Sequence, residues 1–296
     1  MKKMLFIYNP KSGKTTIRQR LTDIISLFTA GGYDVLAHPT QARGDATQTV
    51  RRFCHDVDLV VCSGGDGTLD EVVTALMEES PESELGYIPS GSTNDFANSL
   101  GLSRNLVRAA QDILDGKTYR CDVGKFNSAF FVYVAAFGVF TDVAYKTDQD
   151  LKNTFGHLAY LAQAGPQFLH IPSYHLRGEI DGTPVSGNYT YGMITNSRFV
   201  GGMKNITGPS VDMDDGIFEV TLVHVPANPI ELSEILATLL SRNSQSPLVE
   251  TYKASRVNLR FDAATEWTLD GEYGGSHEQV EIQNLHRALH LYLPDR

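Results

Sequence analysis

The first 125 residues alternate between short apolar runs and segments whose apolar residues recur at helical spacing. The apolar runs predict strands at Leu5–Tyr8, Val35–Ala37, Leu59–Cys62, Leu85–Ile88 and Tyr119–Val123. Helical spacing begins at Thr16 and stops at Gly31-Gly32, returns weakly from Ala46, and is clear after Gly67. This alternation predicts an α/β domain with a doubly wound parallel sheet and helices on both of its faces.

Beyond residue 125 the pattern changes to strand-like segments separated by Gly, Pro, Asn and Asp. Strands are expected at Phe130–Ala136, Tyr189–Ile194, Ile217–Val223, Leu248–Tyr252, Val257–Phe261, Val280–Ile282 and Leu289–Leu293. Helical interruptions are expected near 151–168 and at Pro229–Ser241. The pattern predicts a β-rich second domain over residues 126–283, an antiparallel sandwich or barrel, with Trp267 in its core.

The chain of 296 residues is acidic, with 25 Lys and Arg against 35 Asp and Glu and a formal charge of −10. This balance argues against a general nucleic-acid-binding protein, which needs a basic face to neutralise phosphates. The first 22 residues nevertheless hold six bases and no acid. That end of the chain suits an anionic ligand, although a solvated first helix explains it equally well.

The cysteines and the apolar runs bear on the compartment. Three cysteines without CxxC spacing give no disulfide framework. No apolar stretch reaches the ~20 residues that a membrane-spanning helix needs. We therefore expect a cytoplasmic protein.

Three polar, glycine-containing loops follow three of the predicted parallel strands. They are Asn9–Thr15, Gly64–Thr68 and Pro89–Asp95. Ligands of open α/β sheets bind at the carboxyl ends of the strands, and glycine lets backbone N–H groups approach phosphate oxygens closely. Any one loop could be an ordinary cap or turn, but three at one sheet edge predict a phosphate-bearing ligand.

These loops do not carry the standard nucleotide motifs. A P-loop ending at Gly13-Lys14-Thr15 would need glycine in place of Tyr8, and a dinucleotide fingerprint starting at Gly65 would need glycine in place of Asp70.

The loops instead resemble the three nucleotide-site motifs of the soluble bacterial diacylglycerol kinase and lipid kinase family, which is related to sphingosine kinases and NAD kinases. The matching residues are Asn9-Pro-Lys-Ser-Gly13, Gly64-Gly-Asp-Gly-Thr68 with Glu71, and Gly91-Ser-Thr-Asn-Asp95. The resemblance continues at Asp122-Val-Gly124, Asp215-Gly216 and Asp270-Gly-Glu272, so it spans nearly the whole chain. The late Asp-Gly-Glu and the β-rich second half distinguish lipid kinases from NAD kinases.

The resemblance implies a set of site residues. The ATP site would be lined by Asn9, Pro10, Lys11, Ser12, Gly13, Thr40, Gly65, Asp66, Gly67, Thr68, Asp70, Glu71, Ser92, Thr93, Asn94 and Asp95. Asp66, Asp95 and Asp122 would serve a magnesium-centred network, and a structural magnesium would sit at Asp215 with oxygens near Asp212 and Ile217. Asp270 and Glu272 would supply the base that takes the proton from the lipid hydroxyl, with Glu272 favoured. Residues from about 284 to 296 would return to complete the first domain.

Two positions depart from the family pattern, and two acidic groups have plainer interpretations. Asp70 stands where the family usually has Asn, which adds negative charge beside the phosphates, and Ser92 stands where it usually has Thr. Taken alone, the Asp270–Glu272 segment also fits a solvated hairpin turn, and the acids at 212–215 fit an ordinary turn before a strand.

The leading expectation is an ATP- and Mg²⁺-dependent lipid kinase that converts diacylglycerol to phosphatidic acid. It would touch the inner face of the membrane transiently and could form a homodimer, both as the family implies. The charge-free, aromatic segment Thr154–Leu176 is expected to border the lipid cleft and touch the membrane. The alternatives are another lipid alcohol (phosphatidylglycerol, a sphingoid base, an undecaprenol-like alcohol), an NAD kinase-like enzyme with a soluble substrate, and a nucleotide-binding regulatory module without turnover.

Overall fold

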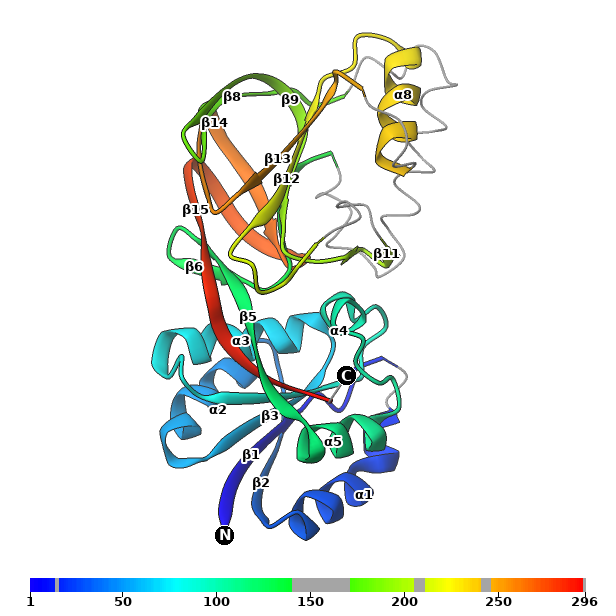
Figure 1. The fold of residues 1–296 in the computed structure, drawn as a ribbon, viewed down its shortest axis with the longest axis vertical. Helices are drawn as coiled ribbons and strands as arrows, with labels where there is room; N and C mark the ends of the chain where they lie inside the picture. Colours follow the sequence, from blue (N-terminus) through cyan, green and yellow to red (C-terminus); the bar gives the residue numbers. More distant parts are fainter. Residues whose placement is uncertain (14–15, 140–170, 205–210, 241–245, 295–296) are drawn as a thin grey trace. The chain divides into compact units, whose positions relative to one another are not determined.

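The computed structural model describes residues 1–13, 16–139, 171–204, 211–240 and 246–294. Contacts divide the chain into two units (Figure 1). Unit 1 comprises Met1–Val123 and His286–Arg296, and unit 2 comprises Gly124–Leu285.

Unit 1 is built on a parallel sheet. Its strands are β1 (Lys2–Tyr8), β2 (Tyr33–Pro39), β3 (Leu59–Gly64) and β4 (Glu84–Pro89), in the order β2-β1-β3-β4. The end of β15 (Glu272–Leu293) lies parallel to β4, pairing His290 with Glu84. Every residue of β3 is buried, as its continuous apolar sequence predicts for a central parallel strand.

Helices cover both faces of this sheet, which confirms the predicted α/β fold. On one face, α1 (Thr16–Ala30) and α5 (Leu106–Asp115) pack on alternate strand residues such as Met4 and Phe6. The helices α2 (Asp45–Phe53) and α3 (Asp66–Glu79) pack together on the other face (Figure 1). Two short helices, η1 (Cys54–Asp56) and α4 (Asp95–Leu100), complete the helices of the unit.

Unit 2 is built on an antiparallel sheet, as its alternating sequence predicts. The order β13-β12-β9-β7-β14-β15 runs across it, and β8 pairs with the ends of β9 and β14 that β7 does not use. The remaining elements are a two-stranded ladder, the strand β5 that begins in unit 1, the short strand β6 that pairs with it, and one helix. The bounds are β5 (Lys117–Phe126), β6 (Ala129–Phe131), β7 (Val134–Gly138), β8 (Tyr174–Ile180), β9 (Thr183–Thr195), β10 (Phe199–Val200), β11 (Met203–Lys204), β12 (Phe218–His224), α8 (Pro229–Leu240), β13 (Val249–Ala254) and β14 (Arg256–Leu269).

Trp267 lies at the centre of the core of unit 2 and is fully buried, as predicted. The rings of Phe137, Phe126 and Phe261 surround it at centroid distances of 4.9, 5.0 and 6.0 Å. Burial of four aromatic side chains in one cluster stabilises the sheet that carries the candidate residues Asp270 and Glu272.

The structure corrects the single strand expected over residues 130–136. It consists of two strands, β6 and β7, because the chain bends at Val132 and Tyr133. The amides of these two residues donate to the carboxylate of Asp270 instead of to a neighbouring strand. A local hydrophobic pattern carries no sign of such a distant acceptor.

Two further expectations concern helices. The helix expected at Pro229–Ser241 is confirmed as α8, whereas the one expected near 151–168 lies outside the described residues. No helix within the described ranges is long and apolar enough to span a membrane.

Candidate functional site

Three loops of unit 1 meet at the carboxyl edge of the parallel sheet, after β1, β3 and β4. The Asn9 N–H donates to the Ser63 carbonyl at 2.8 Å, and the Asn9 side-chain amide donates to the Thr68 hydroxyl at 3.3 Å. The Ser90 N–H donates to the Gly64 carbonyl at 2.9 Å. Each loop is therefore hydrogen-bonded to the end of a neighbouring strand or to the helix behind it.

Glycines let these loops pack backbone against backbone. A Cβ on Gly91 would lie 2.5 Å from the Gly65 Cα, and a Cβ on Gly13 would lie 2.4 Å from the Ser90 carbonyl oxygen. Gly13 also has φ +51°, a conformation that residues with a side chain rarely adopt. The three motifs thus form one continuous backbone surface of the kind that cradles phosphates.

Tyr87 supports the end of β3 from within the core. It is buried, and its hydroxyl donates to the Gly64 carbonyl at 3.1 Å. Burial, reinforced by the charge of Asp66, holds the pKa of Tyr87 well above its usual range. The phenol therefore stays protonated and remains a hydrogen-bond donor.

Asp66 links the second loop to the third. It is the first residue of α3, and its carboxylate accepts the N–H groups of Asp95 at 3.1 Å and Phe96 at 3.4 Å, at the start of α4. Asp95 itself is buried. Two of the three residues expected in the magnesium network therefore meet at one junction, Asp66 through its carboxylate and Asp95 through its backbone N–H.

The third expected carboxylate, Asp122, is fully buried in β5 and accepts the N–H of Arg287 at 2.7 Å. Arg287 has φ +55°, so this carboxylate holds β15 at a bend within the strand. The contact belongs to unit 1 and ties its two sequence segments together.

The other expected nucleotide residues differ in exposure. Lys11 and Ser92 are exposed, whereas Ser12 and Asn94 are buried. Intermediate exposure is shared by Pro10, Thr40, Gly67, Thr68, Asp70 and Thr93. Asn94 closes its own loop, since its side chain accepts the Gly91 N–H and donates to the Gly91 carbonyl.

Glu71, another of the expected nucleotide residues, contacts the start of α2. Its carboxylate accepts the backbone N–H groups of Gly44 at 2.8 Å and Ala46 at 3.2 Å, at the start of α2. The sequence offers no local signal for this contact, because the partners are 27 and 25 residues apart.

Asp270 occupies a buried turn in unit 2. Asp270 and Gly271 have φ values of +51° and +83° and join β14 to β15 in a two-residue hairpin. The Asp270 carboxylate accepts three consecutive backbone N–H groups, from Val132 at 2.5 Å and from Tyr133 and Val134 at 2.9 Å. These three bonds tie the turn to the segment between β6 and β7.

Glu272 is the first residue of β15 and is partly exposed. Of the two carboxylates that the sequence left open for the base, Glu272 is the more exposed. Asp270 fixes the turn that precedes Glu272.

The expected structural magnesium position lies before β12. Asp215 accepts the N–H of Ile217 at 3.0 Å, and Asp212 lies 3.4 Å from the guanidinium of Arg198. Burial raises the pKa of nearby Glu219 to about 7, with Lys253 at 3.6 Å opposing and Asp215 reinforcing the shift.

The metal expectations can be compared with the donor groups present. Within the described residues, no three His, Cys, Asp or Glu side chains gather closely enough to form a metal-binding group. Magnesium usually keeps several waters and takes one or two carboxylates, so the Asp66 and Asp95 carboxylates suit it by chemistry. Asp215 and the main-chain oxygens near it are donors of the same hard type.

Comparison with known proteins agrees with this arrangement. Residues 3–126 match the family described as "Diacylglycerol kinase catalytic domain", and residues 134–292 match "YegS C-terminal NAD kinase beta sandwich-like domain". Diacylglycerol kinases of two Staphylococcus aureus strains, JH9 and Newman, are each 32% identical over 297 residues, covering 99% of this chain and 93% of theirs. The chain belongs to the diacylglycerol kinase family of lipid kinases.

Solved structures show the same fold. A structure described as a putative diacylglycerol kinase from Bacillus anthracis str. Sterne aligns with a TM-score of 0.82 at 24% identity, covering 99% of this chain and 97% of that chain. A second from the same strain aligns with a TM-score of 0.77 at 23% identity and the same coverage. The kinase family and its two-part architecture, an α/β unit and a β-sandwich-like unit, are therefore confirmed.

Proposed function

We propose that this lipid kinase transfers the γ-phosphoryl group of ATP to the hydroxyl of diacylglycerol and so forms phosphatidic acid and ADP. The observation that carries the proposal is the backbone contact between the loops at Gly13, Gly65 and Gly91. Such a surface presents N–H groups to phosphate oxygens, as phosphoryl transfer requires. The relatives named diacylglycerol kinase support the choice of lipid.

The proposed reaction assigns separate tasks to the two units. The loops of unit 1, with Lys11 beside them, hold the triphosphate. Bound magnesium, held by Asp66 and Asp95, would neutralise phosphate charge. Glu272 takes the proton from the lipid hydroxyl. The hydroxyl oxygen forms the new bond to the γ-phosphorus, and the bond between that phosphorus and the ADP oxygen breaks. Asp270 keeps the turn before Glu272 in place.

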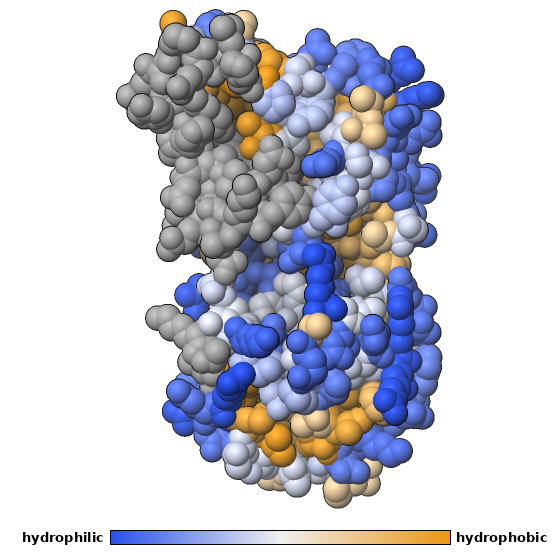
Figure 2. Space-filling view, turned by 180° about the vertical axis from the view of Figure 1, so that it is seen from behind, coloured by the Kyte–Doolittle hydropathy of each residue, from blue (hydrophilic) through white to orange (hydrophobic). Residues whose placement is uncertain are grey.

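Diacylglycerol resides in membranes, so the proposal includes peripheral contact with a lipid surface. Support comes from α8, where Ile230 and Leu240 are 80% and 60% exposed. Figure 2 shows small hydrophobic patches near the top of the molecule, beside the grey atoms. The segment 154–170 of the expected membrane contact lies outside the described residues.

The test is a radiolabelled-ATP assay against vesicles that contain diacylglycerol, phosphatidylglycerol or a sphingoid base, with soluble NAD as a separate acceptor. The proposal expects labelled phosphatidic acid, lost in Asp66→Ala and Glu272→Ala. Product from another lipid or from NAD would replace the proposed substrate, and nucleotide binding without turnover on any acceptor would indicate a regulatory module.

A glycine pair supplies a matched control for the loop surface. Gly13→Ala places a Cβ 2.4 Å from the Ser90 carbonyl, whereas Gly32→Ala, at a similarly positive φ, meets nothing within 4 Å. Nucleotide binding should be lost in Gly13→Ala and kept in Gly32→Ala. Equal binding by both variants would contradict the role of the loop contact.

A further inference from the structure

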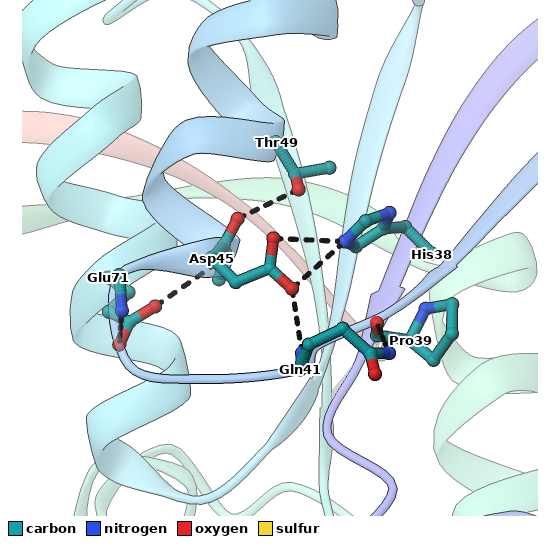
Figure 3. A network of polar contacts seen from close by, with 8 residues as sticks. His38, Pro39, Gln41, Asp45, Thr49 and Glu71 are labelled. Atoms are coloured by element: carbon teal, nitrogen blue, oxygen red, sulfur yellow. Dashed lines mark hydrogen bonds and ion pairs between the residues drawn. The ribbon is translucent and has the colours of Figure 1, made fainter.

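Two carboxylates hold the turn over residues 40–44, between β2 and α2 (Figure 3). Asp45 accepts the Gln41 N–H at 2.7 Å, and both of its oxygens lie 3.3 Å from His38 Nε2. Glu71 accepts the N–H groups of Gly44 and Ala46. The turn is therefore held by Asp45, from the helix that follows it, and by Glu71, from the neighbouring helix α3.

The contact of Glu71 replaces a missing helix cap. Gly44 is the N-cap of α2, has φ +82°, and has no side chain to accept the first helical N–H groups. Those groups normally find a side-chain acceptor within the same turn, and the helix dipole favours a negative charge there. Here the acceptor comes from α3, and the Thr47 hydroxyl adds a bond to the Glu71 carbonyl at 3.1 Å.

This contact links the turn to the loops described above. The helix α3 that carries Glu71 begins at Asp66, directly after Gly65 in the second loop. At the other end of the turn, the Thr40 N–H donates to the Tyr8 carbonyl at 2.9 Å, where the first loop begins. Glu71 therefore sets the position of the turn against a helix whose first residues are part of the proposed phosphate surface.

We propose that Glu71 is a positioning residue for the nucleotide, which holds the Thr40 turn against α3 and does not itself contact ATP. The inference rests on the proposed function and on the expectation, drawn from the family resemblance, that Thr40 lines the ATP site. Both Glu71 oxygens accept backbone N–H groups of the turn and of the start of α2, so the carboxylate is engaged there. Loss of the turn weakens ATP binding in the ground state and the transition state alike, which raises KM and leaves kcat unchanged.

The test compares Glu71→Ala and Glu71→Gln with Glu78→Ala. Glu78 lies on the same helix and pairs with Arg51 of α2, so its removal loosens the same two helices without touching the turn. Glu71→Ala should raise the KM for ATP roughly tenfold, the effect of losing hydrogen bonds to one charged group, with kcat within about twofold. Glu71→Gln keeps an acceptor oxygen and should recover part of the affinity, and Glu78→Ala should keep the wild-type KM.

Calorimetric titration of the full chain with ATP, without lipid, separates this inference from the proposed function. Weaker binding by Glu71→Ala than by Glu78→Ala supports the positioning role even if no lipid is phosphorylated. A lipid panel without product would overturn the proposed function alone. Equal affinities, a loss of kcat at constant KM, or a wild-type chain that does not bind ATP would overturn the positioning role. Melting temperatures show which variants are folded. If Glu71→Ala does not fold, Glu71→Gln replaces it in the comparison with Glu78→Ala.

Discussion

Two Asp-Gly turns in unit 2 share a backbone conformation and differ in their surroundings. Asp181-Gly182 joins β8 to β9 with φ values of +43° and +77°, and Asp270-Gly271 joins β14 to β15 with +51° and +83°. Each aspartate accepts N–H groups from a distant segment: Asp181 those of Ser255 and Arg256, at 2.8 Å each, and Asp270 the three described above. Asp181 is exposed, whereas Asp270 is 4% exposed.

This comparison distinguishes the structural role of Asp270 from the role proposed for Glu272 in the Asp-Gly-Glu motif. Because both aspartates anchor a neighbouring segment, anchoring is a property of the turn and needs no catalytic explanation. The turns differ in the next residue, which is Thr183 after the first and Glu272 after the second. The comparison therefore agrees with the proposal that Glu272, and not Asp270, is the base.

The largest effect is expected when the residue after each turn is changed. Glu272→Gln removes the proposed base and should lower kcat by about 10²–10⁴, while Thr183→Ala should leave kcat unchanged. Steady-state assays with diacylglycerol vesicles measure the rates, and circular dichroism shows whether both variants keep the wild-type melting temperature. Activity of Glu272→Gln within threefold of wild type would remove Glu272 from the mechanism.

A smaller effect is expected from the anchoring carboxylates. Asp270→Asn replaces one carboxylate oxygen with an NH₂ group, so at least one of the three buried backbone N–H groups loses its acceptor. This should destabilise unit 2 by about 2–3 kcal/mol. Asp181→Asn should cost less than about 1 kcal/mol, because water reaches its exposed partners. Urea denaturation measures both. Equal losses would mean that burial does not distinguish the two turns.

The glycines of the turns test the backbone alone. Gly271→Ala and Gly182→Ala both place a side chain at positive φ, and a Cβ meets nothing closer than 3.9 Å in the first and nothing within 4 Å in the second. Both should cost about 1 kcal/mol, the penalty for the left-handed conformation. A much larger loss for Gly271→Ala in the same denaturation experiment would show that the buried turn has other constraints.

The smallest effect concerns Asp45, the partly exposed anchor of unit 1. The Gln41 N–H, with help from His38, lowers the pKa of Asp45 below 3.8. A pKa lowered by folding contributes stability above the unfolded pKa, and this is lost as the pH falls through the folded pKa. Asp45→Asn should therefore lower the melting temperature by about 1–3 °C at pH 7, and the difference should close below pH 3.8. A constant difference across that range would show that the charge contributes nothing.

The local sequence pattern predicts correctly those elements that depend on residues close in sequence or on a continuous apolar run. The apolar run at β3, the helix ended by Gly31-Gly32 and the buried Trp267 follow directly from side-chain chemistry. The three glycine loops could be placed at one edge for the same reason, since strand order in a parallel sheet brings carboxyl ends together.

Contacts between segments that lie far apart in the chain could not be predicted from the local sequence pattern. The break between β6 and β7 depends on Asp270, 137 residues from Tyr133, and the capping of α2 depends on Glu71. The single strand β15 was predicted as two pieces, Val280–Ile282 and Leu289–Leu293, because mostly polar residues between them interrupt the apolar pattern. In the structure, pairing with β14 extends the strand back to Glu272, and its end pairs with β4. The Asp181-Gly182 turn was missed even though Asp-Gly is a strong hairpin signal.

The course of β15 has a practical consequence for dividing the chain. This strand starts at Glu272 and ends in parallel pairing with β4, so the matched kinase region at 3–126 lacks one strand of its own sheet. Expressed alone, that region would leave the edge of β4 open to pairing with other molecules and would be prone to aggregate. A fragment that aims to isolate the nucleotide-binding half needs residues 286–293 fused back onto it.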